Sequence, residues 1–197
     1  KILRDVGEAY GYDTVRFFML SAHYRSPLNY SNDLMEAAQN GLNRIKNCKD
    51  NLEFALSHAK GEILTREEQE LLKELNMFEE KFHKAMEDDF NTADAISFIF
   101  ELVKFANTYA KEGATHAFAE AVYNEFMKLN NILGLLFETE ANKEHGLSDE
   151  AIQQYIEDRK AAKKARDFAE ADRIRDWLKD QGILIEDTRE GVRFKRI

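Results

Sequence analysis

Hydrophobic residues recur at every third or fourth position along much of the chain, which is the spacing of an amphipathic α-helix. Between residues 31 and 138 they form four separate stripes, with short polar joints between them. The run over residues 95–106 is apolar on nearly every side, as expected of a helix at the centre of a bundle. The pattern therefore predicts an up-and-down bundle of four long helices over residues 31–138.

Side chains that favour helix starts precede three of these stripes. Ser31 and Asn32 come before the first, and Thr65 with Glu68 three residues later matches the capping-box pattern. Asn91 follows an acidic run and precedes the apolar stretch of the central helix. We expect these residues to mark the helix starts.

Residues 1–30 predict a connector that precedes the bundle. It contains a short helix from Asp5 to Tyr10 and a second helix capped by Asp13, and Pro27 then ends helical structure. We treat this connector as a part separate from the bundle.

The chain after the bundle predicts a second, small domain. Residues 139–147 turn polar and are interpreted as a linker, and residues 148–197 form the domain. Its expected elements are a helix capped by Ser148, a helix over residues 167–181, and a hairpin of the runs 183–185 and 192–194. The fold class is therefore mainly α, with a small α+β end.

Composition narrows the classes of function. The chain has 197 residues, 44% of them hydrophobic, but only one Pro and nine Gly, too few for a turn-rich all-β protein. The single cysteine, Cys48, excludes an intrachain disulfide and a cysteine-based zinc cluster, which favours a reducing, cytoplasmic setting. No apolar run approaches the roughly 20 residues of a membrane span. Because the chain opens without Met or a leader pattern, we expect it to be part of a longer protein.

No pattern of catalytic residues is found. Glycine-rich phosphate loops are absent, the five histidines are scattered, and Cys48 falls on a helix stripe as a small buried thiol. We therefore predict no catalytic, cofactor-binding or metal-binding residues in this chain.

Charge divides the chain into two parts of opposite sign. The net charge is −9, yet residues 159–197 hold 12 Lys and Arg against 8 Asp and Glu, a balance of +4, and residues 1–158 carry −13. A basic end on an acidic body favours contact with a polyanion at that end only. A solvated helix face that is merely basic is the alternative.

Four stretches resemble one family, in that family's order along the chain. They are Asp13–Arg16 (DTVR), Ser21–Ser31 (SAHYRSPLNYS), Asp88–Ile96 (DDFNTADAI) and Arg159–Ile197. The first resembles the motif that names the DALR anticodon-binding class of tRNA synthetases. The other three resemble cysteinyl-tRNA synthetases, the last over nearly every position.

The resemblance implies the C-terminal part of a class I enzyme that attaches cysteine to tRNA(Cys) using ATP. This part would hold the connector at the inner corner of the tRNA, a DALR-type antiparallel bundle and a domain that binds the GCA anticodon. ATP with Mg and one Zn would belong to the absent catalytic part, with no cofactor in this chain. The resemblance further implies a cytoplasmic monomer whose partner is tRNA(Cys), with no role at DNA or a membrane.

The resemblance also assigns anticodon-binding residues. Phe168 would stack on an anticodon base, and Asp172, one helical turn later, would accept both donors of guanine. Lys163, where the family usually has Arg, would approach guanine's oxygen or a phosphate, and Asp187 would accept the cytosine amino group. Further tRNA contacts are expected at phosphates from Arg159, Lys160, Lys164, Arg166 and Lys195, and at the inner corner from His23, Tyr24 and Arg25.

The anticodon-binding and inner-corner residues also have an alternative interpretation in which their role is structural and they do not contact RNA. Phe168 would be core and Asp187 a turn former, with Lys163 solvated, Asp172 paired with Arg173 or Arg175, and His23, Tyr24 and Arg25 stabilising the connector. Trp177 lies nine residues after Phe168, on the opposite helix face, and is predicted to be core. For the whole chain, the alternative is a helical protein-interaction module with a basic tail and no nucleic-acid role.

Overall fold

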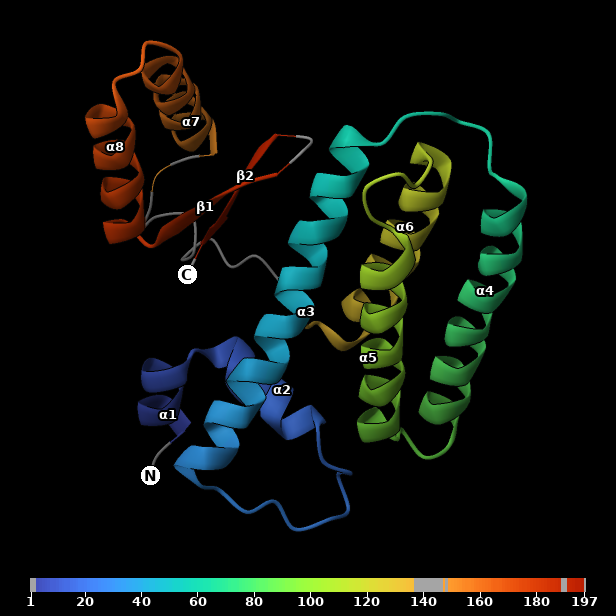
Figure 1. Ribbon diagram of the computed structural model, residues 1–197. Coiled ribbons are helices and arrows are strands. Elements are labelled where there is room, and N and C mark those ends of the chain that lie inside the picture. Colours follow the sequence, from blue (N-terminus) through green and yellow to red (C-terminus); the bar gives the residue numbers. More distant parts are fainter. Residues whose placement is uncertain (1–2, 137–146, 148, 189–190, 197) are drawn as a thin grey trace. The chain divides into compact units, whose positions relative to one another are not determined.

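The chain divides into two compact units, Lys1–Phe137 and Glu138–Ile197. A computed structural model of the chain describes residues 3–136, 147, 149–188 and 191–196 (Figure 1). The predicted linker 139–147 lies outside the described residues except for Leu147, as does the predicted cap Ser148. Within the described ranges, no helix combines the length and the apolar character that crossing a membrane requires.

The described residues of the first unit form six helices. Four long helices, α3 to α6, lie side by side in the up-and-down arrangement that the stripes predict, and α5 packs against α3, α4 and α6 (Figure 1). Two shorter helices precede them, and α2 packs on α3. The bounds are α1 Leu3–Tyr10, α2 Tyr12–Leu20, α3 Asn32–His58, α4 Arg66–Glu87, α5 Thr92–Tyr109 and α6 His116–Leu133.

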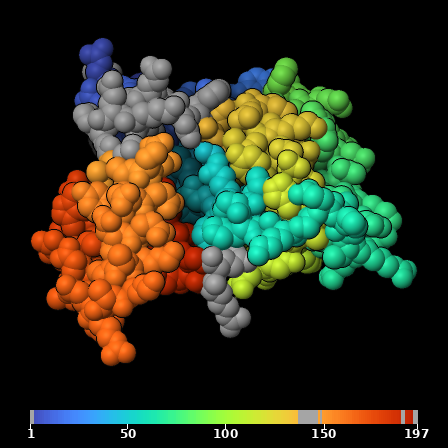
Figure 2. Space-filling model, turned by 90° about the horizontal axis from the view of Figure 1, so that it is seen from above, coloured from blue at the N-terminus to red at the C-terminus, as the bar shows by residue number. Residues whose placement is uncertain are grey.

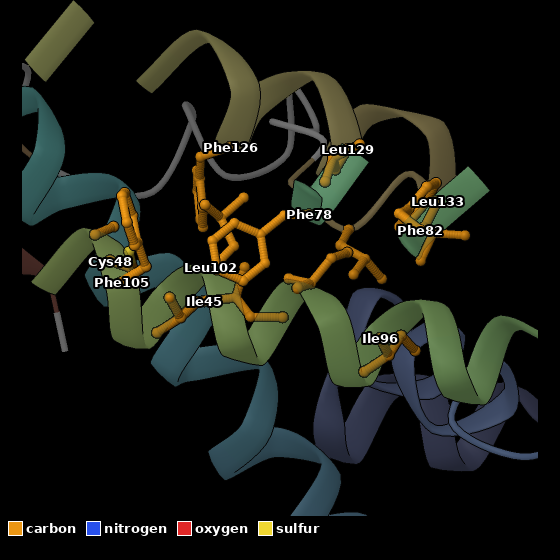
Figure 3. Packing of buried hydrophobic residues seen from close by; sticks show 14 of the residues in the cluster. Ile45, Cys48, Phe78, Phe82, Ile96, Leu102, Phe105, Phe126, Leu129 and Leu133 are labelled. Carbon is orange, nitrogen blue, oxygen red and sulfur yellow. The ribbon is translucent and has the colours of Figure 1, made fainter. Parts of the chain in front are cut away.

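Large side chains from all four long helices meet in one core (Figure 3). Phe82 and Phe126 are fully buried there, and the rings of Phe78 and Phe105 meet edge to face at a centroid distance of 5.5 Å. Burial of each such side chain stabilises the fold by about 1.5–3 kcal/mol. Cys48 lies in the same core, buried as predicted, and this burial raises the pKa of its thiol to about 12.

The helix starts follow the sequence signals, with one exception. The side chains of Ser31, Thr65 and Asn91 each accept a hydrogen bond from the backbone N–H three residues later. The prediction that Asp13 caps α2 is wrong, because Gly11 precedes that helix with a φ of 84°. Asp13 lies in the first turn, where its carboxylate binds Lys46 of α3 instead.

Glu68 joins the starts of two helices. Its carboxylate accepts a hydrogen bond from the Thr65 backbone N–H at 2.8 Å, which closes the capping box of α4. It also accepts the backbone N–H of Thr115, the N-cap of α6, at 2.8 Å. Burial by itself would raise the pKa of Glu68, but the bonds from Thr115 and Thr65 lower it on balance.

Replacing Glu68 by Ala leaves two backbone donors at helix starts without their acceptor. We expect the free energy of unfolding, measured by urea titration, to fall by about 2–3 kcal/mol. The exposed neighbour Glu67 provides the control, since Glu67→Ala should cost less than about 0.5 kcal/mol. Equal losses for the two variants would show that Glu68 does not join the helices in this way.

The second unit pairs two helices with a hairpin, as predicted. Its elements are α7 Asp149–Lys164, α8 Phe168–Asp180, β1 Ile183–Asp187 and β2 Val192–Arg196. The strands are antiparallel, and Asp187 lies opposite Val192 at the turn. The helices pack on each other, and α8 packs on β1. In Figure 2 the visible face of this unit is formed mostly by α7, in orange, with α8 beside it.

Aliphatic side chains form the small core of this unit. Ile152 and Ile156 of α7, Ile174 and Leu178 of α8 and Ile183 of β1 are buried together. The prediction that Trp177 belongs to this core is wrong, because 38% of the residue is exposed. Its ring lies on Tyr155 at a centroid distance of 4.5 Å, since the neighbouring Leu178 occupies the inward position.

Candidate nucleic-acid interface

Asp187, at the end of β1, is bound by two cations from α7. Nη1 and Nη2 of Arg159 donate to its Oδ1 and Oδ2 at 2.9 and 3.1 Å, and Nζ of Lys163 donates to Oδ2 at 2.8 Å. The Arg159 bonds first, and the Lys163 bond next, hold the pKa of Asp187 far below its ordinary value. The Asp187 side chain is nevertheless half exposed, so an ionised carboxylate faces solvent beside the hairpin turn.

Arg159 lies beneath this carboxylate. Only 9% of its side chain is exposed, whereas a contact with phosphate was expected from the sequence. The reason is its place on α7, where Ile152, Ile156 and Arg159 follow each other at helical spacing and form the buried face. That spacing was the available signal for a buried arginine, and the resemblance alone did not reveal it.

Two predicted anticodon-binding residues lie on α8. Phe168 is its first residue and is 64% exposed, which excludes the alternative that it is core. Asp172, one turn later, pairs with Arg175 at 3.2 Å in an exposed contact, while Arg173 pairs with Glu170 instead. Exposed pairs of this kind are weak, about 0.2–1 kcal/mol, so Asp172 can exchange its partner for a ligand.

The predicted residues therefore fall into two groups. In the first group, Arg159 and Lys163 each form an ion pair with Asp187. In the second group, Phe168 and Asp172 share one face of α8. The two groups are connected through the packing of α7 on α8 and of α8 on β1.

The corner between α7 and α8 is basic. Arg166 has a φ of 61°, a left-handed conformation that is uncommon for a residue with a side chain, and Asp167 then caps α8. The side chains of Lys160, Lys164 and Arg166 are exposed, and Lys160 is 3.4 Å from Glu157. The side chain of Lys195 lies outside the described residues.

In the first unit, the predicted inner-corner residues bind the turn between α4 and α5. The rings of His23 and Tyr24 stack at 5.0 Å, and the Tyr24 hydroxyl donates to Asp89 at 2.8 Å. Arg25 forms an ion pair with the same carboxylate at 3.1 Å. These contacts fit the structural alternative, since they attach the connector to the bundle, while a role at tRNA stays a prediction.

The DTVR motif has a structural role of the same kind. Nε of Arg16 donates to the backbone carbonyl of Leu133 at 2.9 Å, at the end of α6, where helix carbonyls lack partners within the helix. Asp13 binds Lys46 of α3. The two charged residues of the motif thereby attach α2 to two helices of the bundle.

Within the part of the chain that the structure describes, no group of three His, Cys, Asp or Glu side chains could hold a metal ion. Near His83, the carboxylate of Glu79 binds Lys128, which lowers the pKa of that carboxyl.

Comparisons with known proteins agree with the resemblance. The DALR domain model matches residues 81–138. The chain is 44% identical over 98% of its length to a cysteine–tRNA ligase of Lachnospira eligens, 45% over 99% to that of Clostridioides difficile, and 46% over 98% to that of Lachnoclostridium phytofermentans.

The chain is a relative of cysteine–tRNA ligases over nearly its whole length. It spans only about two fifths of the length of these relatives, 40% to 42%. The predicted resemblance to a part of a cysteinyl-tRNA synthetase is therefore confirmed, as is the mainly α fold with a DALR-type bundle and a terminal hairpin.

The ion pairs predict how pH acts on the second unit. The pKa of Asp187 is lower in the folded protein than in the unfolded chain, where it is about 3.9. The ion pairs of Asp187 therefore stabilise the fold fully above about pH 3.9. This stabilisation is lost as the pH falls through the folded pKa. A ¹³C titration of the carboxyl should show Lys163→Ala raising the pKa of Asp187. Lys164→Ala, which removes an exposed neighbouring charge, should leave the titration curve in place. Coincident curves for all three proteins would contradict the assigned contacts.

Proposed function

We propose that this chain is the tRNA-recognition part of a cysteine–tRNA ligase, and that its second unit binds the GCA anticodon of tRNA(Cys). The similarity to cysteine–tRNA ligases over 98% of the chain supports the tRNA partner. The observation that carries the anticodon role is that the exposed Phe168 lies on the same unit as the ionised Asp187. An exposed aromatic ring and an acceptor-only carboxylate are what recognition of unstacked bases requires.

In this proposal each anticodon-binding residue has a distinct task. Phe168 stacks on an unpaired base, a contact worth about 1–3 kcal/mol. Asp172 leaves Arg175 and accepts the ring N–H and the amino group of guanine, a pair of donors that the other standard bases do not present together. Asp187 accepts the amino group of cytosine, and Lys163 contributes a positive charge for guanine's oxygen or a phosphate.

Phosphate contacts would come from the basic corner and the hairpin. Lys160, Lys164 and Arg166 are exposed there, and we keep Lys195 in the proposed set on sequence grounds. Such contacts raise affinity for any RNA and weaken with salt, without selecting a sequence. His23, Tyr24 and Arg25 would contact the inner corner of the tRNA from the connector.

The chemistry of the reaction would belong to the rest of the protein. We propose that the whole protein is a cytoplasmic monomer that attaches cysteine to tRNA(Cys), with ATP, Mg and one Zn bound in a catalytic part that this chain lacks. The chain by itself then supplies recognition only. Exchange of ATP with pyrophosphate by the purified chain would contradict this division.

Removal of the exposed ring tests the stacking role. We expect Phe168→Ala to weaken binding of a stem–loop RNA carrying GCA by about tenfold in fluorescence anisotropy, since one base loses its stacking partner. Ile63→Ala removes another exposed apolar side chain, on the first unit, and should leave affinity unchanged. No RNA binding by the parent chain would favour the alternative, a helical module that docks a protein.

Removal of one charge tests the guanine contact. Asp172→Asn keeps the shape of the side chain but turns one acceptor into a donor, so the preference for guanine at the first anticodon position should fall by about 1–3 kcal/mol. The measurement compares stem–loop RNAs with GCA and ACA. Asp180→Asn, at the far end of α8, provides the matched control, and its preference should equal that of the parent. An unchanged preference in Asp172→Asn would remove Asp172 from the site.

A further inference from the structure

Arg159 carries a charge at a core position, which is costly for a small domain. Its side chain continues the buried face of α7 after Ile152 and Ile156. Its Nε is buried, with no hydrogen-bond partner among the described residues. An apolar side chain of similar size would avoid both costs, and such replacements of buried ion pairs are often neutral or stabilising. The position of Arg159 therefore calls for a role besides stability.

Arg159 and Lys163 use specific acceptor sites of Asp187. A carboxylate offers about four lone-pair sites, two on each oxygen. Arg159 occupies one on each oxygen, and Lys163 occupies a second on Oδ2. Among the described contacts, the remaining acceptor site lies on Oδ1. The planar guanidinium fork fixes the plane of the carboxylate, and with it the direction of this remaining site.

We infer that Arg159 is a positioning residue that holds Asp187 so that Oδ1 accepts the exocyclic amino group of a nucleobase. The inference rests on the proposed function and deepens it. Arg159 acts from beneath and does not touch the RNA, in place of the phosphate contact that the sequence suggested. The same bonds keep Asp187 ionised, so the carboxylate has no proton to donate.

A carboxylate that is held in one orientation and only accepts hydrogen bonds can discriminate between cytosine and uracil. Cytosine presents an amino group at the position where uracil presents a carbonyl oxygen. With uracil, two acceptors would face each other, and both would be left without a donor. Loss of the orientation would weaken the cytosine bond and allow the carboxylate to turn away from uracil, so the discrimination would fall.

The substitution Arg159→Lys keeps the charge and removes the fork. Affinities of the 197-residue chain are measured for two stem–loop RNAs that differ only in their anticodons, GCA and GUA, and each protein is also unfolded in urea. We expect the parent to prefer GCA by about tenfold and Arg159→Lys to bind both RNAs within about twofold of each other. Arg173→Lys, an exposed arginine of α8, is the matched control and should keep the tenfold preference.

If Arg159 served stability alone, Arg159→Lys would lower the free energy of unfolding in urea and would keep the tenfold preference for GCA. A folded Arg159→Lys chain that keeps the tenfold preference would overturn the positioning role and leave the proposed function intact. A parent chain that binds neither RNA, or binds both equally, would overturn the proposed function together with this inference.

Asp187→Asn supplies a second test in which Arg159 itself is kept. Arg159 and Lys163 both donate to Oδ2, so the amide oxygen would take that position at the cost of one Arg159 bond. The amide NH2 would then take the Oδ1 position and donate to the carbonyl of uracil. We expect the preference for GCA to disappear or to reverse toward GUA. A tenfold preference for GCA retained by this variant would show that Asp187 does not contact that base, and would overturn the inference even if Arg159→Lys failed to fold.

Discussion

The bidentate ion pair between Arg159 and Asp187 is the contact on which the second unit's proposed recognition surface depends. It joins the buried face of α7 to the end of β1, next to the hairpin turn. A unit with so few buried side chains has little hydrophobic stabilisation to spare. Placing a guanidinium at a core position is therefore a cost that the fold accepts in order to hold one carboxylate in one orientation.

In the first unit, polar contacts at helix ends hold the helices and the connector together. Charged residues at helix ends make these attachments. Glu68 accepts backbone donors at the starts of α4 and α6, and Arg16 donates to the last carbonyl of α6. The carboxylate of Asp89 accepts a hydrogen bond from the Tyr24 hydroxyl and forms an ion pair with Arg25, both of the connector. Each contact satisfies a group that a helix end or turn would otherwise leave without a partner, so the connector and bundle form one compact unit.

The distribution of charge gives the two units different relations to RNA. The excess of basic residues lies in the last part of the chain, and the body before it is acidic. An acidic bundle repels the phosphate backbone, which would restrict contact to the basic residues 159–197 and to particular residues of the connector. A domain with the proposed anticodon role would benefit from this restriction, because binding elsewhere along the RNA carries no information about sequence.

Local sequence determined most of the architecture. The stripes at helical spacing, the caps at Ser31, Thr65 and Asn91, and the apolar runs of the hairpin predicted elements that the structure contains. These features depend on residues within one or two turns of each other, so periodicity and capping chemistry reveal them. The resemblance pointed to cysteinyl-tRNA synthetases, and the comparisons confirmed the similarity.

Contacts between distant residues were decided only by the tertiary structure. Asp13 was expected to cap its own helix and instead binds Lys46, and Trp177 was expected in the core but lies at its edge on Tyr155. Arg159 was expected at the surface, yet it lies beneath a carboxylate 28 residues away in the chain. Charge and residue type indicate which groups are able to pair, whereas the partner that each one takes depends on which helix faces the packing brings together.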